Sequence, residues 1–169
     1  MIKYSIVQTS WGEVLLAGSS RGLCGLALPP ARKCDPHRRA QKFWPDCIHA
    51  GSLLQDLQAQ VAAYFEGDPI DFNTSVDLFE VSDFQRKILS TSKNLKYGQT
   101  ISYINLAKAI GQPGAARAVG TALAENPIPL VIPCHRVVAT NGVGGFSASQ
   151  GVKLKEKMLE MEASVTAPA

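Results

Sequence analysis

The stretch SYINLAKAIGQPGAARAVGTALAE, residues 102–125, contains two short helical patterns around a GQPG turn. The hydroxyl group of Ser102 can cap a first helix over residues 103–110. A second helix follows at about residues 115–125 and ends before Pro127, because the residue before a proline avoids helical geometry. The pattern predicts a helix-turn-helix, a unit that many proteins use to bind DNA.

The second of these helices is unusually bare. Between positions 115 and 122 its only long polar side chain is Arg117, whereas a helix that reads base edges normally presents several hydrogen-bonding side chains. This favours sequence-independent binding in a narrow groove, in which Arg117 occupies space rather than reads bases. Close packing between the two helices would explain the small residues equally well. The small residues are Ala115, Ala116, Ala118, Gly120, Thr121 and Ala122.

The net charge of +3 over 169 residues is too small to indicate a nucleic-acid partner by itself. Its distribution is uneven, because residues 82–162 hold ten Lys and Arg against five Asp and Glu, while the remainder holds seven against nine. A basic C-terminal half beside a mildly acidic N-terminal half can mark a nucleic-acid-binding part. Charged faces of solvent-exposed helices would give the same count.

The N-terminal half has the pattern of a small sheet. Strands are predicted over residues 2–7, 14–17 and 23–28, with turns between them. Residues 29–50 are punctuated by prolines and are expected to be irregular, and residues 53–65 have the apolar spacing of a helix. We therefore expect a small α/β domain with a mostly antiparallel sheet.

A change of composition near residues 75–82 separates this half from the rest, so we expect domains at 1–78 and 79–165. Ser82 can cap a helix at the start of the second domain, and residues 152–162 have the pattern of a final amphipathic helix. The predicted class is α+β, a sheet-bearing domain followed by a mainly helical domain with the helix-turn-helix.

No apolar run reaches the length of a membrane span, and the N-terminus lacks a secretory signal pattern. A cytoplasmic protein with four free cysteine thiols is therefore expected. Cys34 with His37, and Cys47 with His49, are of the residue types that bind zinc, but their irregular spacing favours unconnected loop residues. We expect neither a metal nor another cofactor.

The segment PCHRV, residues 133–137, follows a short apolar run and places a thiol beside an imidazole. A reactive cysteine needs thiolate character, which a neighbouring histidine can supply. Neighbours along a strand point to opposite sides, so Cys134 and His135 can interact only in an irregular turn or through a water molecule. A carboxylate from elsewhere could orient the imidazole. A buried thiol beside a structural histidine is the alternative.

A glycine-rich loop, residues 142–145, follows this thiol and precedes Phe146 and Ser147. Such a loop favours a pocket in which a flat ring meets Phe146 and hydrogen-bonds to the backbone and to Ser147. Chemistry at Cys134 is therefore the preferred interpretation.

The run IPCHRVV at 132–138, with GGFS at 144–147, resembles the signature of the methylated-DNA–protein-cysteine methyltransferases, the O6-alkylguanine-DNA alkyltransferases. The similarity extends from Phe84 to Glu162, and the N-terminal half matches in shape. It implies a ribonuclease-H-like N-terminal sheet and a winged-helix-like C-terminal domain. The implied activity is DNA repair by one irreversible transfer of an alkyl group from O6-alkylguanine, or O4-alkylthymine, to a cysteine. A stacked base must be flipped out of the duplex for this.

The resemblance also implies a catalytic role for each matching residue. Cys134 accepts the alkyl group, His135 removes the thiol proton through a bridging water molecule, and Glu162 orients and charges the imidazole. Tyr103 crowds the phosphate of the flipped nucleotide and donates a proton to the departing guanine. Asn126 ties the second helix of the helix-turn-helix to the active-site segment.

The partner that the resemblance implies is double-stranded DNA with O6-alkylguanine, bound by a monomer through the minor groove, largely independently of sequence and away from any membrane. Arg117 fills the gap that the flipped base leaves. Further implied DNA contacts are Tyr103, Ala116, Ala118 and Gly120, and the implied base contacts are Pro129, Val137, Phe146 and Ser147.

Two alternatives stay open. If Lys153 rather than Lys155 is the matched lysine, Glu160 replaces Glu162 as the partner of the imidazole, although the register through Lys155 is preferred. The chain could also be a lesion-binding protein without transfer, a regulatory helix-turn-helix protein or a cysteine hydrolase. The presence of Cys134, the bare second helix and the lack of a second hydrolase motif disfavour these three.

Overall fold

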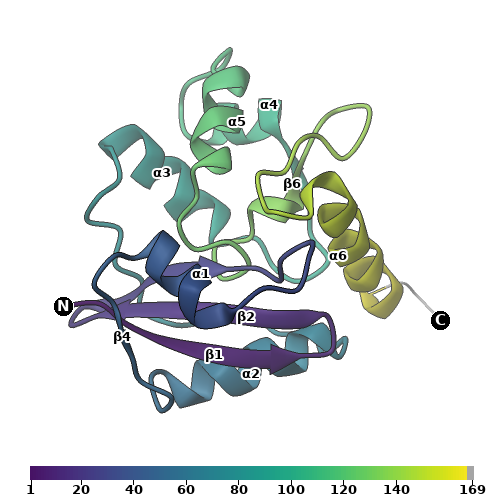
Figure 1. The fold of residues 1–169 in the computed structure, drawn as a ribbon. Coiled ribbons are helices and arrows are strands. Elements are labelled where there is room, and N and C mark those ends of the chain that lie inside the picture. Colours follow the sequence, from purple (N-terminus) through teal and green to yellow (C-terminus); the bar gives the residue numbers. More distant parts are fainter. Residues whose placement is uncertain (167–169) are drawn as a thin grey trace.

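A four-stranded sheet occupies the N-terminal half of the chain, and helices make up most of the C-terminal half (Figure 1). The computed structural model describes residues 1–166. The α+β class and the order of the two parts confirm the prediction from the sequence. Within residues 1–166, no helix combines the length and the apolar character that a membrane span requires.

The sheet has the strand order β3-β2-β1-β4. Strands β1 (Lys3–Thr9), β2 (Gly12–Ser19) and β3 (Gly22–Ala27) form two successive antiparallel hairpins, and each coincides with a predicted strand. The short strand β4 (Ile48–His49) adds to β1 in parallel. The sheet is therefore mostly antiparallel, as expected.

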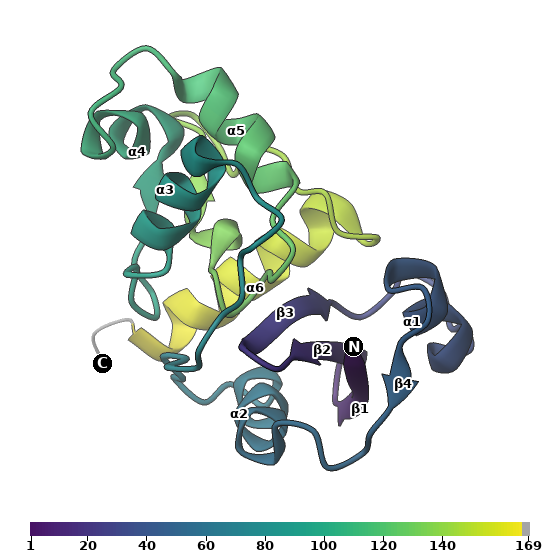
Figure 2. The same ribbon diagram turned by 90° about the vertical axis from the view of Figure 1, so that its left-hand side faces the viewer.

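Both faces of the sheet are covered, because successive side chains of a strand point to opposite sides. Val14 and Leu16 face the main core with helix α2 (Gln55–Phe65), whereas Leu15 faces a smaller cluster with helix α1 (Pro36–Phe43). Figure 2 shows the two helices on opposite sides of the sheet.

Helix α1 and strand β4 lie in residues 29–50, where an irregular segment was expected, so that expectation was wrong. The carboxylate of Asp35 accepts hydrogen bonds from two backbone N–H groups of the first turn, and Pro36 occupies the first helical position. Only Ala40 of this helix is buried. The apolar periodicity that reveals a helix is therefore almost absent from its sequence.

The C-terminal part contains the predicted helix-turn-helix, helices α4 and α5, with Ser102 capping α4 by accepting a hydrogen bond from a backbone N–H. Strands β5 and β6 form a short parallel pair. The elements of this part are α3 (Asp83–Ser92), β5 (Ile101–Ser102), α4 (Tyr103–Ala109), α5 (Ala116–Ala124), η1 (Cys134–Arg136), β6 (Val137–Val138) and α6 (Gly151–Thr166).

The two halves share one hydrophobic core, which joins residues of the sheet and α2 to residues of α3, α4, α5 and α6. A backbone hydrogen bond of 2.9 Å runs from Leu26 N–H to the carbonyl of Pro127, and the amide of Gln150 donates to the carbonyl of Pro29. Helix α6 crosses between the sheet and the other helices (Figure 2). Its buried face is thus in contact with both halves of the chain.

Candidate active site

Cys134 begins the single turn η1, directly after the buried segment 130–133. The turn is irregular, as the adjacent cysteine and histidine require. The side chain is largely buried, with 7% of the residue exposed, but it lines a cavity of about 730 Å³ between α5 and the loop at 145–147. The cavity is also lined by Tyr103, Ala116, Arg117, Gly120, Phe146 and Ser147.

Cys134 also lines a second cavity, of about 890 Å³, on the side of the N-terminal half. Helix α1 and the segment that follows β3 form one wall of this cavity. Asn126 and Pro129 lie on its opposite wall. The thiol is therefore accessible from a cavity on either side, although little of its own surface is exposed.

His135 and Glu162 form a buried pair behind the thiol. They are 0% and 1% exposed, and the Nε2 atom of His135 lies 2.7 Å from Oε1 of Glu162. The other ring nitrogen, Nδ1, is buried and makes no hydrogen bond with any group of residues 1–166. With the proton on Nε2, Nδ1 carries the lone pair that can accept a proton. The carboxylate beside this imidazole is that of Glu162 and not that of Glu160.

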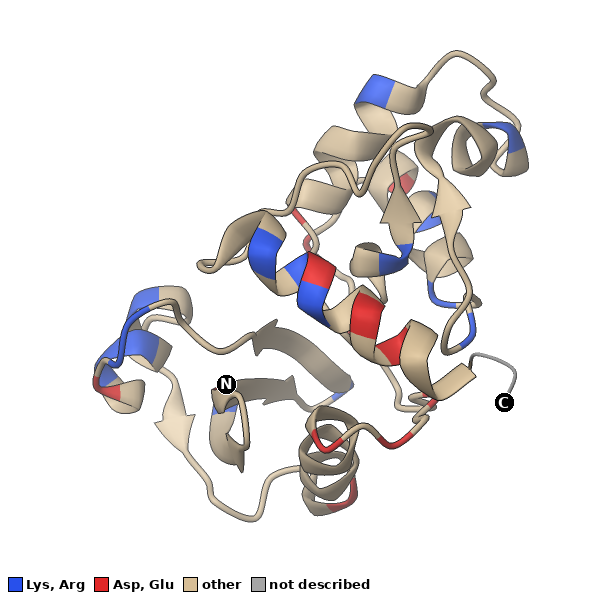
Figure 3. Ribbon diagram, turned by 90° about the vertical axis from the view of Figure 1, so that its right-hand side faces the viewer, with Lys and Arg blue, Asp and Glu red and all other residues tan. Residues whose placement is uncertain are grey.

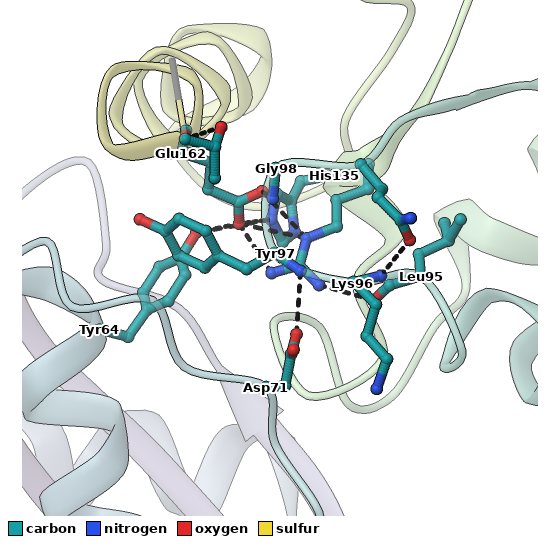
Figure 4. A network of polar contacts seen from close by, with 11 residues as sticks. Tyr64, Asp71, Leu95, Lys96, Tyr97, Gly98, His135 and Glu162 are labelled. Atoms are coloured by element: carbon teal, nitrogen blue, oxygen red, sulfur yellow. Dashed lines mark hydrogen bonds and ion pairs between the residues drawn. The ribbon is translucent and has the colours of Figure 1, made fainter. Parts of the chain in front are cut away.

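The carboxylate of Glu162 accepts hydrogen bonds from several segments of the chain (Figure 4). Arg136 donates through Nε and Nη2, at 3.0 Å to Oε2 and 2.9 Å to Oε1 respectively. The backbone N–H of Gly98 donates to Oε2, and the hydroxyl of Tyr64 donates to Oε1. A buried carboxylate needs this number of donors to remain ionised.

The pair consists of an anion and a neutral base. Burial alone would raise the pKa of Glu162, but hydrogen bonds from His135 and Arg136 lower it to about 2. Burial lowers the pKa of His135, and Glu162 opposes that effect without overcoming it. The lowered pKa favours a neutral imidazole at rest, and the hydrogen bond to Glu162 orients the ring. That Glu162 also charges the imidazole stays a prediction.

The sulfur of Cys134 rests as a thiol. Burial raises the pKa of Cys134, while the Asn126 amide and the Lys155 ammonium group act in the opposite direction. Only the thiolate is a strong nucleophile, so a base must remove the proton before the sulfur can attack. The lone pair on Nδ1 of His135 is the suitable acceptor next to it in the chain.

Lys155 is fully buried and joins α4, β6 and the loop at 145–147 through its hydrogen bonds. Its ammonium group donates to the carbonyls of Val137 and Gly145 and to the hydroxyl of Tyr103, at 2.7, 3.1 and 3.3 Å. Burial lowers its pKa to about 8, and the nearby Cys134 counteracts this. Because Lys155 is the donor, the hydrogen of the Tyr103 hydroxyl is free to be donated elsewhere.

The close packing of Tyr103 explains a glycine of the loop. Gly144 has a φ of +75°, and a Cβ atom there would lie 2.8 Å from Cε2 of the Tyr103 ring. Burial raises the pKa of Tyr103, and the negative charge of a Cys134 thiolate would raise it further. The phenol therefore stays protonated at neutral pH.

Helix α5 presents the small residues that the sequence placed there. Arg117 is exposed and lines the cavity together with Ala116 and Gly120. Ala118 is exposed but lines neither cavity. The side chain of Asn126 donates to the carbonyl of Ile132 and accepts from a backbone N–H, both at 3.0 Å, and so joins the end of α5 to the segment before Cys134.

The residues expected to contact the base are not all at the cavity wall. Phe146 and Ser147 line the cavity with Cys134, and the Ser147 hydroxyl donates to the carbonyl of Ala124 at the end of α5. Val137 is fully buried, lines neither cavity, and its carbonyl accepts from Lys155. Its contact with a base stays a prediction.

Three residues with contacts in the site were not singled out from the sequence: Tyr64, Arg136 and, for its hydrogen bonds, Lys155. Arg136 and Lys155 were counted in the charge balance of residues 82–162, but both are buried in the site with Glu162. Lys155 and Glu162 are seven residues apart, two helical turns, which places them on one face of α6 and could have signalled a shared buried environment. Figure 3 shows residues of both charge signs along this helix.

Of the four residues considered for zinc, His37 and His49 lie close together. The Tyr4 hydroxyl lies 2.7 Å from Nδ1 of His37, and the rings of His37 and His49 are 5.1 Å apart, edge to face. Cys34 is exposed and Cys47 is buried. Among residues 1–166, no group of three or more His, Cys, Asp or Glu side chains has an arrangement for holding a metal ion.

The fold and the site define a class, a helix-turn-helix protein with a cysteine poised for nucleophilic chemistry. A family model for the ribonuclease-like domain of 6-O-methylguanine DNA methyltransferase matches residues 2–78, and a model for its DNA binding domain matches residues 83–164. The chain belongs to the O6-methylguanine-DNA methyltransferase family. It is a DNA-repair enzyme that binds DNA and transfers a methyl group to a protein cysteine.

Known relatives cover nearly the whole chain. The methylated-DNA–protein-cysteine methyltransferase of Sulfolobus acidocaldarius is 35% identical over 162 residues, which are 96% of this chain and 94% of the relative. The methyltransferase of Mycobacterium tuberculosis is 35% identical over 170 residues, which are 100% of this chain and 96% of the relative. The crystal structure of the M. tuberculosis enzyme matches with a TM-score of 0.81 and 34% identity, over 100% and 96% of the two chains. Its complex with DNA matches with a TM-score of 0.80 and 31% identity, over 96% and 93%.

Proposed function

We propose that Cys134 is the methyl acceptor of this enzyme and that His135 and Glu162 activate it. The observation that carries the proposal is the position of Cys134. Its side chain lines the cavity beside α5, and the buried imidazole–carboxylate pair lies next to it in the chain. Of the other cysteines, Cys24 and Cys47 line neither cavity, and Cys34 lines only the larger one. A domain boundary near residue 78 would place all of these catalytic groups in the second domain.

The proposed partner is double-stranded DNA with O6-alkylguanine, bound by one monomer in the cytoplasm. Helix α5 enters the minor groove, and its small side chains support a grip that depends little on sequence. The alkylated base rotates into the cavity, and Arg117 takes its place in the stack. The Phe146 ring supports the base, while Ser147 and the backbone near Cys134 read its edges. Pro129 and Asn126 line the second, larger cavity, which Cys134 also lines.

The side chains of the site can account for every proton and bond in the proposed transfer. The thiol proton of Cys134 passes to Nδ1 of His135 through a bridging water, the sulfur–carbon bond forms, and the bond between the carbon and O6 breaks. Tyr103 gives its proton to the guanine, which leaves neutral. The Lys155 ammonium group, 3.3 Å from the phenolic oxygen, stabilises the phenolate until it regains a proton from solvent. The product is a thioether that no group of the site can cleave, so each molecule acts once.

Mass spectrometry of the intact protein tests the assignment. After incubation with duplex DNA containing O6-methylguanine, the protein should gain one methyl group per molecule, located on the peptide that contains Cys134. Cys134→Ser should gain none, whereas Cys24→Ser should behave as the unaltered protein. A methyl group on another residue, or tight DNA binding with unchanged mass, would show that Cys134 is not the acceptor.

A further inference from the structure

Tyr64 reaches the catalytic pair from the N-terminal half of the chain. It lies in the last turn of α2, is fully buried, and its hydroxyl donates a hydrogen bond of 2.8 Å to Oε1 of Glu162. The hydroxyl oxygen of Tyr64 also lies 3.5 Å from Nε2 of His135 (Figure 4). Tyr64 and Glu162 are 98 residues apart in the sequence.

The Tyr64 hydroxyl can act only as a donor to this carboxylate. Burial raises the pKa of Tyr64, and the negative charge of Glu162 raises it further, so the phenol keeps its proton. Oε1 of Glu162 therefore accepts from three side chains, those of His135, Arg136 and Tyr64. Each additional donor spreads the negative charge of the carboxylate and restricts its rotation.

We infer that Tyr64 is a positioning residue for methyl transfer, through which the N-terminal half sets the orientation and the basicity of the Glu162–His135 pair. The inference rests on the proposed function, in which this pair activates Cys134. Tyr64 itself lines neither of the two cavities. It acts through Oε1 of Glu162, the atom that also accepts the hydrogen bond from the imidazole N–H of His135.

Loss of the hydroxyl has two consequences with defined signs. The carboxylate is held by one donor fewer, so the imidazole is less well fixed and transfer at saturating DNA slows. The charge of Glu162 is shared with one donor fewer and stabilises the protonated imidazole more strongly, so the pKa of His135 rises. The base is then protonated, and inactive, up to a higher pH.

Tyr97 provides a matched control. Its ring is 6.0 Å from that of Tyr64, centroid to centroid, and its hydroxyl is buried without a hydrogen-bond partner in residues 1–166. Tyr97→Phe therefore removes a hydroxyl from the same cluster without removing a bond to Glu162. Both variants keep the aromatic ring, so the packing of α2 against the C-terminal half is preserved.

The experiment measures single-turnover methyl transfer from duplex DNA with O6-methylguanine, between pH 5 and 9, for the full-length chain. We expect Tyr64→Phe to lower the rate at saturating DNA by about tenfold, the effect of losing one hydrogen bond to a charged group. DNA affinity should be unchanged, and the acid limb of the pH–rate profile should move to higher pH. Tyr97→Phe should match the unaltered protein in all three measurements. The His135 ring signals, followed by NMR titration, should report the same upward shift only in Tyr64→Phe.

A double-mutant cycle separates this inference from the proposed function. In a Glu162→Gln background, Tyr64→Phe should have little further effect on the rate, because its target is already altered. If Tyr64→Phe leaves rate and pH profile unchanged while Glu162→Gln slows transfer, Tyr64 has no positioning role but the proposed mechanism stands. If Glu162→Gln is itself as fast as the unaltered protein, the proposed mechanism fails. A slow Tyr64→Phe with an unmoved pH profile would also overturn the inference, since it would indicate a merely structural role.

Discussion

Replacing Glu162 by Gln should lower the stability of the whole protein as well as the rate of transfer. The change keeps the size and shape of the side chain and removes its charge. Arg136, which is 3% exposed, then has a buried guanidinium group without an anion. The perturbation is thus the loss of one partner from a buried ion pair.

Two independent routes give its magnitude. Removing one partner of a buried ion pair costs about 3–5 kcal/mol, because the remaining charge is left uncompensated. The pKa of Glu162 is about 2 in the folded chain against an ordinary value of 4.5. This difference corresponds to about 3 kcal/mol of stabilisation by the ionised form. We therefore expect Glu162→Gln to lose about 3–5 kcal/mol at pH 7, a large share of the stability of a typical domain.

Urea unfolding at a series of pH values measures this loss. The carboxylate has a depressed pKa in the folded state, so its contribution is complete above the unfolded pKa and disappears as the pH falls toward the folded value. The gap between the unaltered protein and Glu162→Gln should be constant from pH 7 to about 5 and narrow below about 4.5. Glu160→Gln, on the same helix, is the control and should unfold as the unaltered protein does. A gap below about 1 kcal/mol at pH 7, or one that does not depend on pH, would refute the view that Glu162 is an ionised buried partner.

The remaining predictions concern the cavity. Arg117→Ala should slow repair of duplex DNA more than it slows attack on a free O6-alkylguanine base, because only the duplex leaves a gap to fill; equal slowing in single-turnover assays would exclude that role. Gly144→Ala should cost about 1–3 kcal/mol in thermal unfolding and also slow transfer, because its positive φ and the adjacent Tyr103 ring leave no room for a methyl group. Gly142→Ala, with open space at its Cβ position, should be nearly neutral in both assays.

The helix-turn-helix and the cysteine segment could be predicted because their signals are local. Ser102, the GQPG turn and the proline after α5 lie within one short stretch, and each terminates or starts a helix by its own backbone chemistry. The cysteine, the histidine and the loop glycines are likewise within 12 residues of one another, from 134 to 145. Local patterns of this kind require no knowledge of which distant segments meet.

Helix α1 and the partners of Glu162 could not be predicted in this way. Helix α1 buries only Ala40, so its sequence lacks the apolar stripe by which a helix is recognised. Tyr64 belongs to an apolar helical pattern, which indicates that the side chain is buried but not what its hydroxyl contacts. Its functional contact depends on how two halves of the chain dock, which periodicity does not report.

The burial of Arg136 and Lys155 was also not predicted from the sequence. Arg136 and Lys155 contributed to the basic balance that suggested DNA binding, yet both are buried and satisfied by Glu162 or by backbone carbonyls. Without Arg136, Lys155 and Glu162, residues 82–162 hold eight basic side chains against four acidic ones. The asymmetry persists, so the argument for a nucleic-acid partner survives the removal of the charges that serve the site.

The electrostatics around Cys134, the proposed acceptor, disfavour the reactive form of its sulfur at rest. A raised pKa leaves little thiolate on Cys134 at neutral pH, and thiolate is the form that reacts with electrophiles and oxidants. In the proposed mechanism, transfer of the proton to His135 is favoured when bond formation consumes the developing thiolate, since burial disfavours the imidazolium that results. An acceptor that is part of the protein chain is lost with its first reaction. A buried thiol with a neutral base therefore protects the protein from reagents that do not fit the cavity, whereas a permanently ionised cysteine would not.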